Sequence, residues 1–261
     1  MNSKDEAPKD KGSAGKDLDR LDGDRAFRAK KSFIANISHE IRTPMNAIMG
    51  FAQMLKNSDL SEEQDEYVDV IIDSGTKLLS IIHSLLELSN LETGEAAVKP
   101  VICDMYLFFS RLWQNCEMQI KSKQLDPVLE LPSELPKVII DEDKLERVLD
   151  LLISNAVKFT GSGMVQLSVE MESDDDEYQL VINVCDTGCG IAPHRMRTIY
   201  DIFEQGDSGI TRTHSGLGLG LSIVSRLVEL MGGDILASSV VGAGTCFKLI
   251  LPVEIYKEYG A

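Results

Sequence analysis

The stretch FIANISHEIRTPMNAIMG, residues 33–50, decides the fold of the N-terminal part of the chain. Its apolar positions, continued to residue 55, recur at helical spacing and share one face: Ile37, Ile41, Ile48, Ala52 and Leu55. His39 lies on the opposite side of that helix, together with Thr43 and Asn46. The pattern predicts an amphipathic helix that exposes His39 and bends just beyond it, because Pro44 lacks an amide hydrogen and clashes with the preceding turn.

A second helical pattern follows a polar connection at residues 57–61, where Ser61 and Gln64 have the spacing of a capping box. Its apolar stripe advances by four and three residues in turn: Val68, Ile72, Gly75, Leu79, Ile82, Leu86 and Ser89. A parallel stripe widens this face: Ile71, Leu78 and Leu85. A doubled stripe is typical of a four-helix bundle, and one hairpin supplies only two helices. The sequence therefore predicts a homodimer.

The composition narrows the classes of partner. The 261 residues carry a net charge of −16, which argues against a nucleic-acid partner because such binding needs a basic field. No apolar run reaches about 18 residues, so we expect membrane attachment only through segments outside this chain. The N-terminal residues do not form a secretory signal. The five cysteines are odd in number and lack paired CxxC spacing, which predicts reduced thiols in a cytosolic protein.

Beyond a break at residues 94–100, helical and strand patterns alternate. The predicted helices cover residues 104–123, 141–158 and 216–231, and the predicted strands cover 128–131, 137–140, 164–171, 179–185, 233–239 and 245–251. Two of the strand pairs form hairpins, which favours a mainly antiparallel or mixed sheet with helices on one face. We expect an α helical hairpin followed by an α+β two-layer sandwich.

Three glycine clusters stand in this second part: DTGCGI (186–191), GLGLGL (216–221) and GAGT (242–245). Glycines beside a helix N-terminus let backbone N–H groups approach a phosphate. Each cluster alone could be an ordinary turn, and neither a Rossmann fingerprint nor a P-loop is present. A polar helix face precedes them, on which Asn155 offers an amide oxygen suited to Mg²⁺ and Lys158 a cation suited to phosphate. Together they indicate a nucleotide site.

In their order and spacing these motifs resemble the catalytic core of a sensor histidine kinase, of the GHKL ATPase superfamily shared with gyrase, from about residue 28 to 252. The matching boxes are the H-box FIANISHEIRTP (33–44), the N-box ERVLDLLISNAVKFT (146–160), the G1 box DTGCGI (186–191), the F-box IYDIFEQGD (199–207), the G2 box GLGLGL (216–221) and the G3 box GAGTCF (242–247). The sequence of the H-box resembles that of kinases that often carry a fused receiver domain. The resemblance implies a dimeric four-helix bundle joined to a Bergerat-type ATP-binding domain.

On this resemblance the expected segments are a disordered tail (1–17), a helical linker (18–32), a dimerisation and phosphotransfer hairpin (33–95), a catalytic ATP-binding domain (96–256) and a second tail (257–261). His39 would be phosphorylated from ATP, with Glu40 as the base. Thr43 would position water when a partner is dephosphorylated. The partner implied is the receiver domain of a response regulator, and the location is cytoplasmic, including the cytosolic part of a membrane-anchored sensor.

The resemblance also assigns the nucleotide site. Asn155 would bind Mg²⁺, Lys158 would contact phosphate, and Asp186 would accept a hydrogen bond from the adenine amino group beside Thr245. The remaining implied positions are the glycines that admit the base (Gly188 and Gly190), those that admit the phosphates and hinge the lid (Gly216, Gly218 and Gly220), and the lid residues Phe203 and Arg212.

One position departs from the pattern, because Leu151 stands where the family commonly has a second asparagine. We expect weaker binding of the magnesium–nucleotide complex or a shifted lid. Two other functions share the glycine boxes: an ATPase without kinase activity, and a nucleotide-binding dimerisation scaffold. Transfer within one subunit and transfer across the dimer both fit the sequence.

Overall fold

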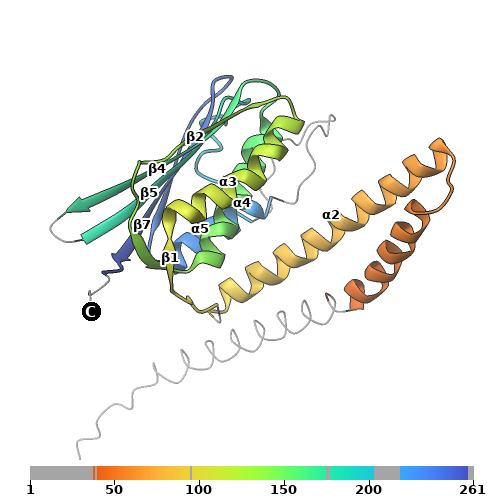
Figure 1. Cartoon of the computed structure of the whole chain (residues 1–261), viewed down its shortest axis with the longest axis horizontal. Coiled ribbons are helices and arrows are strands. Elements are labelled where there is room, and N and C mark those ends of the chain that lie inside the picture. Colours follow the sequence, from red (N-terminus) through yellow and green to blue (C-terminus); the bar gives the residue numbers. More distant parts are fainter. Residues whose placement is uncertain (1–37, 39, 95, 175–176, 203–217, 258–261) are drawn as a thin grey trace, which may run out of the picture. The chain divides into compact units, whose positions relative to one another are not determined.

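The computed structural model describes residues 38, 40–94, 96–174, 177–202 and 218–257 (Figure 1). The chain divides into two compact units, Met1–Asn90 and Leu91–Ala261. The predicted tail at residues 1–17, the linker at 18–32 and His39 lie outside the described residues. The exact boundaries of the predicted domains stay predictions.

The first unit contains a helical hairpin. Its first helix covers residues 40–56 and continues through Pro44, so this proline does not end the helix. The second helix, α2, covers Glu62–Glu92. The predicted capping box is confirmed, because the Ser61 N–H donates to Gln64 Oε1 at 3.0 Å and the Gln64 N–H donates to Ser61 Oγ at 3.3 Å. The start of α2 is therefore fixed by local sequence.

The two helices approach closely around Gly75. This residue is buried, and a methyl group there would lie 3.1 Å from Met45 Cε, with the Met49 sulfur closer still. On the first helix Ala52 is 4% exposed, whereas Ile48 and Leu55 are 48% and 50% exposed. The apolar face predicted for that helix is therefore divided between an inner part and an outer part.

The same division holds on α2. The stripe that contains Val68, Gly75 and Ile82 is buried against the first helix or half-buried along its length. Ile71 and Leu78, on the second stripe, stay 44% and 39% exposed. Leu85, the third member of that stripe, is half-buried, so one hairpin leaves the second stripe exposed at Ile71 and Leu78.

The second unit is an α+β sandwich, as predicted. Its helices are α3 (Met105–Ser122), α4 (Glu142–Phe159) and α5 (Gly220–Leu230). Its strands are β1 (Val101–Asp104), β2 (Asp126–Glu130), β3 (Lys137–Ile140), β4 (Met164–Asp174), β5 (Glu177–Asp186), β6 (Asp234–Val240) and β7 (Gly244–Ile255). Among the described residues they form a seven-stranded sheet in the order β1-β3-β7-β5-β4-β2, with β6 also paired to β7. Of these described strand pairs only β2 and β4 run in parallel, so the sheet is mixed.

The three helices cover one face of this sheet (Figure 1). Asp104 and Asp141 cap α3 and α4, since their carboxylates accept from the N–H groups of Leu107 and Lys144 at 3.1 Å. The core between the layers is apolar and includes the fully buried side chains Phe108, Phe109, Leu112, Leu145, Leu149, Leu152, Leu180 and Ile182. This core holds the ends of α4 and β5 at fixed positions.

Two differences from the sequence prediction have a clear physical reason. The short edge strand β1, which pairs with β3, was not predicted, because four residues at a sheet edge carry little periodicity. Helix α5 begins at Gly220 instead of residue 216. Gly218 has a φ of +70°, in the left-handed region, so a right-handed helix cannot include it.

The prediction that all five cysteines are reduced thiols is wrong for one pair. Cys185 and Cys246 form a disulfide between β5 and β7. They are 61 residues apart in sequence, but the antiparallel register places them directly opposite each other. Cys103, Cys116 and Cys189 are free, as predicted.

Candidate functional site

Asp186 is the last residue of β5, at the point where the strand leaves the sheet. One of its carboxylate oxygens accepts a hydrogen bond from the Gly188 N–H at 2.8 Å. Burial raises the pKa of Asp186, and hydrogen bonds from the backbone N–H groups of Gly188 and Thr245 partly offset that rise. The result is a desolvated acceptor held in one orientation.

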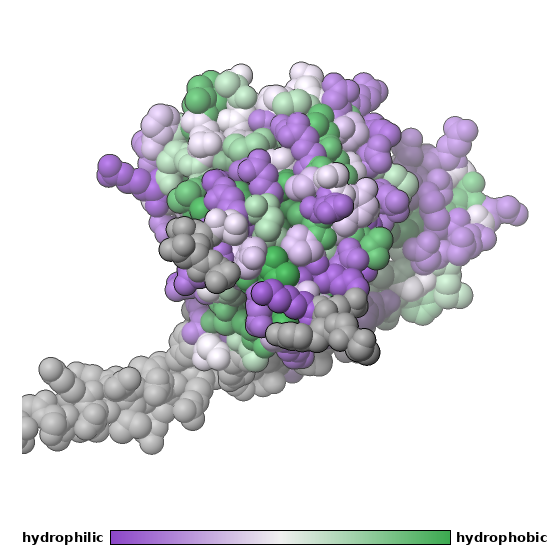
Figure 2. All heavy atoms as spheres, turned by 60° about the vertical axis from the view of Figure 1, so that its left-hand side comes forward, coloured by the Kyte–Doolittle hydropathy of each residue, from purple (hydrophilic) through white to green (hydrophobic). Residues whose placement is uncertain are grey.

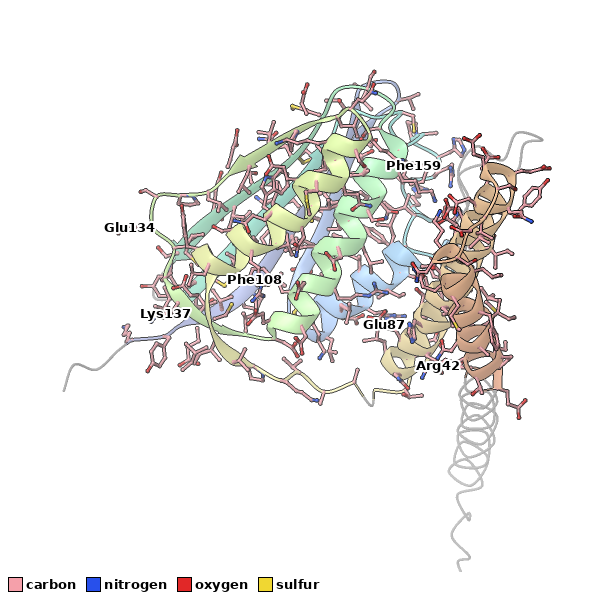
Figure 3. The ribbon with its side chains drawn as sticks, turned by 45° about the vertical axis from the view of Figure 1, so that its right-hand side comes forward. Arg42, Glu87, Phe108, Glu134, Lys137 and Phe159 are labelled. Atoms are coloured by element: carbon pink, nitrogen blue, oxygen red, sulfur yellow. A yellow bond between two sulfur atoms is a disulfide. The ribbon has the colours of Figure 1, made fainter. Side chains whose placement is uncertain are left out.

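Gly188 sits in a space that admits no side chain. A methyl group there would lie 2.8 Å from the Asp186 carboxylate and would meet the carbonyl group of Phe159. Phe159, at the C-terminal end of α4, is labelled in Figure 3. Its carbonyl also accepts a hydrogen bond from the Cys189 N–H at 3.2 Å. The turn after β5 therefore packs directly onto the end of α4.

Gly190 joins the same turn to the β6–β7 connection. Its φ of +69° lies in the left-handed region, and a methyl group there would meet the backbone of Val240 and Val241. The Cys189 carbonyl accepts a hydrogen bond from the Gly242 N–H at 2.8 Å. Two of the predicted glycine clusters are thus in contact through their backbones.

Ser239, which was not predicted, connects these two clusters. Its hydroxyl oxygen accepts a hydrogen bond from the Ile191 N–H at 2.7 Å and donates one to the Gly244 carbonyl at 2.8 Å. It also lies 2.9 Å from the Thr245 hydroxyl. A serine in the strand before GAGT was the only sequence signal, and it is a common residue there.

The third glycine cluster meets α4. A methyl group on Gly220, the first residue of α5, would lie 3.7 Å from Asn155 Nδ2 and 3.8 Å from Leu151 Cδ2. Asn155 and Leu151 are both half-buried and lie one turn apart on α4. The start of α5 therefore faces one amide and one apolar side chain. Its orphan N–H groups and helix dipole favour an anion nearby.

Lys158 supplies a cation near the C-terminal end of α4. Burial lowers the pKa of Lys158, and repulsion from Lys123 lowers it further. Its ammonium lies 4.8 Å from the centre of the Phe159 ring. An anion beside Lys158 would relieve both effects, because it restores favourable contacts to the charged form.

The sequence also predicted residues that the described structure does not place. Phe203, Arg212 and Gly216 lie outside the described residues. Before this stretch, residues 193–200 form successive turns, in which Ile199 is buried. Burial raises the pKa of Tyr200 to about 12, so it stays protonated at neutral pH.

The hairpin carries the other group of predicted residues. Thr43 and Asn46 are exposed on the first helix, as the helical wheel predicts, and Glu40 is exposed as well. His39, between Ser38 and Glu40, lies outside the described residues. These positions belong to the first unit, whereas Asp186, Asn155 and the glycine clusters belong to the second.

The second unit therefore brings together four kinds of group. A fixed carboxylate, glycine turns that bar side chains, an amide and an ammonium lie along α4, β5 and the start of α5. A carboxylate is an acceptor only, so it suits an amino group, while the amide and the ammonium suit phosphate and a hard cation. The arrangement fits an aminopurine nucleotide.

Comparison with known families agrees with this geometry. Residues 140–255 match the family described as "Histidine kinase-, DNA gyrase B-, and HSP90-like ATPase". Residues 29–94 match the "His Kinase A (phospho-acceptor) domain". The two matches lie in separate parts of the chain and follow one another in the predicted order.

Curated relatives cover most of this chain. The autoinducer 2 sensor kinase/phosphatase LuxQ of Vibrio cholerae is 34% identical over 248 residues, which are 92% of this chain and 28% of that protein. Hybrid signal transduction histidine kinase A of Dictyostelium discoideum is 36% identical over 250 residues, which are 90% of this chain and 11% of that protein. Sensor protein GacS of Pseudomonas syringae pv. syringae is 35% identical over 244 residues, which are 93% of this chain and 27% of that protein. The chain spans less than a third of the length of these relatives.

Solved structures share the fold. Full-length ShkA in complex with AMPPNP is 32% identical with a TM-score of 0.72, covering 86% of this chain and 46% of that one. Acinetobacter baumannii histidine kinase AdeS is 23% identical with a TM-score of 0.58, covering 82% of this chain and 97% of that one. At that identity the AdeS likeness concerns the fold alone.

Across the described residues, no helix has the length and hydropathy needed to cross a membrane.

Proposed function

Because the chain belongs to the sensor histidine kinases, we propose that it is an ATP-dependent protein kinase core that phosphorylates its own His39. The phosphoryl group then passes to an aspartate in the receiver domain of a response regulator. The observation that carries this proposal is the Asp186 carboxylate, desolvated and held by Gly188 beside turns that only glycine can occupy.

Asp186 selects the base. The ionised carboxylate accepts hydrogen bonds and donates none, so it favours the exocyclic amino group of adenine. The carbonyl oxygen that guanine has at the corresponding position would face the carboxylate as a second acceptor. Thr245 is directly opposite Asp186 in the β5–β7 register, so it would lie beside the same base.

Asn155, Lys158 and the start of α5 receive the phosphates. Asn155 fits Mg²⁺, because an amide oxygen on a half-buried helix face is a ligand of the kind that this cation takes. Magnesium, when bound, would neutralise phosphate charge. Lys158 would add a charged contact, and Gly218 and Gly220 would let the backbone come close.

The transfer step requires His39 and the γ-phosphate to meet. A neutral imidazole nitrogen of His39 attacks the γ-phosphorus, the bond between the γ-phosphorus and the bridging oxygen breaks, and ADP leaves with the electron pair of that bond. Glu40 would accept or orient the proton on the other ring nitrogen. Because these residues belong to different units, the connection at residues 94–100 must flex during turnover.

The reverse activity would use the same helix. Thr43 is exposed one turn after His39, where its hydroxyl could orient water toward the phosphoaspartate of a receiver. One of the relatives is described as a sensor kinase/phosphatase. The chain would thus set the phosphorylation level of its partner in both directions.

The assembly we propose is a homodimer. It is supported by Ile71 and Leu78, which stay exposed on α2 after the hairpin has formed. Since ATP and receiver domains are intracellular, we place this chain in the cytosol. Any membrane attachment would come from segments outside it.

The test is phosphorylation with γ-labelled ATP, followed by acid treatment. We expect acid-labile label on the wild type, none on His39→Gln, and unchanged nucleotide affinity in that variant. His83→Gln is the matched control, because His83 is an exposed histidine on α2 and should keep the label. Label that survives in His39→Gln would refute the acceptor assignment.

Two further outcomes would identify the competing functions. ATP hydrolysis without any protein-bound phosphate would show an ATPase that is not a kinase. No measurable nucleotide binding in the presence of magnesium would show a dimerisation scaffold, which the apolar Leu151 at the nucleotide site would help to explain.

A further inference from the structure

The disulfide between Cys185 and Cys246 lies one residue from the proposed adenine site. In the β5–β7 register Cys185 faces Cys246, and the next pair is Asp186 with Thr245. The two cysteine Cα atoms are 4.0 Å apart, which corresponds to the narrow type of antiparallel pair, where side chains approach most closely. The pairing thus follows from the fold.

The two cysteines lie on the face of the sheet that the helices leave open. Their neighbours Val184 and Phe247 are buried toward the helices, and successive side chains of a strand point to opposite faces. Cys185 and Cys246 are each partly exposed. Figure 2, with the sheet side of Figure 1 turned forward, shows hydrophilic and hydrophobic residues interspersed at the surface. Small reductants and oxidants can therefore reach this pair.

We propose that Cys185 and Cys246 form a reversible oxidation site that sets the nucleotide affinity of the adjoining pocket. The reactants are of the dithiol class in one direction and hydrogen peroxide or a small disulfide in the other. This inference rests on the proposed function, which places a nucleotide beside Asp186 and the chain in the cytosol, where disulfides are usually redox-sensing or catalytic.

The chemistry balances as a two-electron exchange. A thiolate of the reductant attacks one sulfur, the sulfur–sulfur bond breaks, and a mixed disulfide forms. The second thiol of the reductant displaces the protein sulfur, so the protein gains two electrons and two protons while the dithiol becomes a disulfide. Oxidation by a small disulfide reverses these steps, and peroxide instead passes through a sulfenic acid that the second cysteine attacks with loss of water.

The neighbouring contacts explain why the pocket would respond. Asp186 accepts from the Thr245 N–H, and Gly244 is packed so closely that a methyl group there would meet the Asp186 carbonyl. Ser239 binds the Gly244 carbonyl and lies beside the Thr245 hydroxyl. Two unbonded sulfurs need a van der Waals separation, so reduction must shift side chains or strands within one residue of this network.

The direction of the expected change in nucleotide affinity follows from preorganisation. The disulfide holds β5 and β7 together where Asp186 and Thr245 contact each other, so the oxidised protein has less ordering entropy to lose on binding. We expect reduction to weaken nucleotide binding about three- to tenfold.

The other three cysteines are poor substitutes for this pair. Burial raises the pKa of Cys103 to about 12 and that of Cys116 to about 11, which keeps both thiols protonated and unreactive. Cys189 is exposed, and it provides the matched control because it is the accessible thiol outside the pair.

The experiment uses the chain equilibrated in buffers that contain reduced and oxidised dithiothreitol, a dithiol and its disulfide, in different ratios. Intact-mass spectrometry would follow the loss of two hydrogens, and calorimetry would measure the affinity for AMPPNP with magnesium. We expect a three- to tenfold change that follows the disulfide. The Cys185→Ser/Cys246→Ser double variant should show one affinity, near that of the reduced wild type, and Cys189→Ser should keep the response.

Three results would overturn the proposal: no disulfide at any redox poise, wild-type affinities within twofold in the two states, or a response that persists in the double variant. Equal nucleotide binding in the oxidised and reduced states would refute the oxidation site and leave the proposed kinase function intact. Absence of binding in both states would refute it together with the proposed function.

Discussion

The Ile191 N–H donates to the Ser239 hydroxyl oxygen at 2.7 Å, although the two residues are 48 positions apart in sequence. This bond ties the turn after β5 to the strand that precedes the last glycine cluster. Because the same hydroxyl donates to the Gly244 carbonyl, one small side chain serves both sides of the proposed adenine site.

Ser239→Ala should lower both the free energy of unfolding and the affinity for nucleotide. The substitution leaves the part-buried Ile191 N–H and Gly244 carbonyl without this partner, which typically costs about 1–3 kcal/mol. Thermal unfolding and AMPPNP titration would measure the two effects. Ser238→Ala, an exposed serine on the same strand, should change neither. Equal behaviour of the two variants would contradict the role of Ser239.

Gly188→Ala should weaken nucleotide binding by about tenfold or more. The added methyl group would meet the Phe159 carbonyl and the Asp186 carboxylate, so the turn must move away from α4 at a cost of about 1–3 kcal/mol. Gly161→Ala is the control, because open space surrounds that glycine. Circular dichroism would establish that both variants fold, and calorimetry would measure the binding. Wild-type affinity in Gly188→Ala would show that the turn is not part of the site.

Asp186→Asn should separate stability from binding. The carboxylate's desolvation is removed while an amide oxygen can still accept from the Gly188 N–H, so the unfolding temperature should stay the same or rise. Nucleotide affinity should fall about tenfold or more, since a charged acceptor contributes about 1.5–3 kcal/mol. A loss of stability without a loss of affinity would exclude Asp186 as the base-recognising residue.

The pH dependence follows from the raised pKa of Asp186. An acid whose folded pKa exceeds its unfolded value destabilises the fold when ionised, and this cost is relieved as the pH falls through the folded pKa. Nucleotide affinity should change in the opposite sense, because the protonated group no longer presents two acceptors. As the pH is lowered, binding should therefore begin to weaken at a higher pH than it would if Asp186 had the pKa of an ordinary aspartate. Calorimetry at a series of pH values would measure it, and a profile shared by Asp186→Asn would contradict the assignment.

Leu151→Asn should strengthen magnesium-dependent nucleotide binding. Leu151 lies one turn before Asn155 and faces the start of α5, so an amide there would add an oxygen ligand beside the phosphates. A gain of about 1 kcal/mol, roughly fivefold in affinity, is expected. Leu151→Met keeps the apolar character and volume and should leave the affinity close to wild type. Titrations with and without magnesium would check it, and an unchanged or weaker affinity for Leu151→Asn would refute this explanation.

Leu78→Glu should convert the dimer into a monomer. The side chain is 39% exposed within one hairpin and lies on the stripe that we assign to the second copy, where a buried unpaired charge is costly. Ser80→Glu is the matched control, because it introduces the same charge at an exposed position on another side of α2. Light scattering would measure the mass. A dimeric Leu78→Glu, or a monomeric wild type, would contradict the proposed interface.

Much of the architecture was predictable because it depends on local pattern. The capping box at Ser61 uses residues three positions apart and is confirmed, and the Asp141 cap seen in the structure has the same local spacing. The hairpin of β4 and β5 follows from two strand patterns that lie close together in the sequence. The two apolar stripes of α2 were predictable too. Which of them faces the first helix is known only from the packing of Gly75 against Met45 and Met49.

The sequence by itself determined the order of the boxes, the helical hairpin, the sandwich class and the identity of Asp186 and Asn155 as site candidates. It did so because these features lie within short windows of the chain. The tertiary structure decided the Ser239 bonds, the contact of Gly188 with the end of α4, and the pairing of Cys185 with Cys246. The Ser239 bonds and the cysteine pairing depend on the register between β5, β6 and β7, and the Gly188 contact depends on how the turn after β5 packs against α4. Each joins residues that are well separated in the sequence, so none leaves a periodic trace in it.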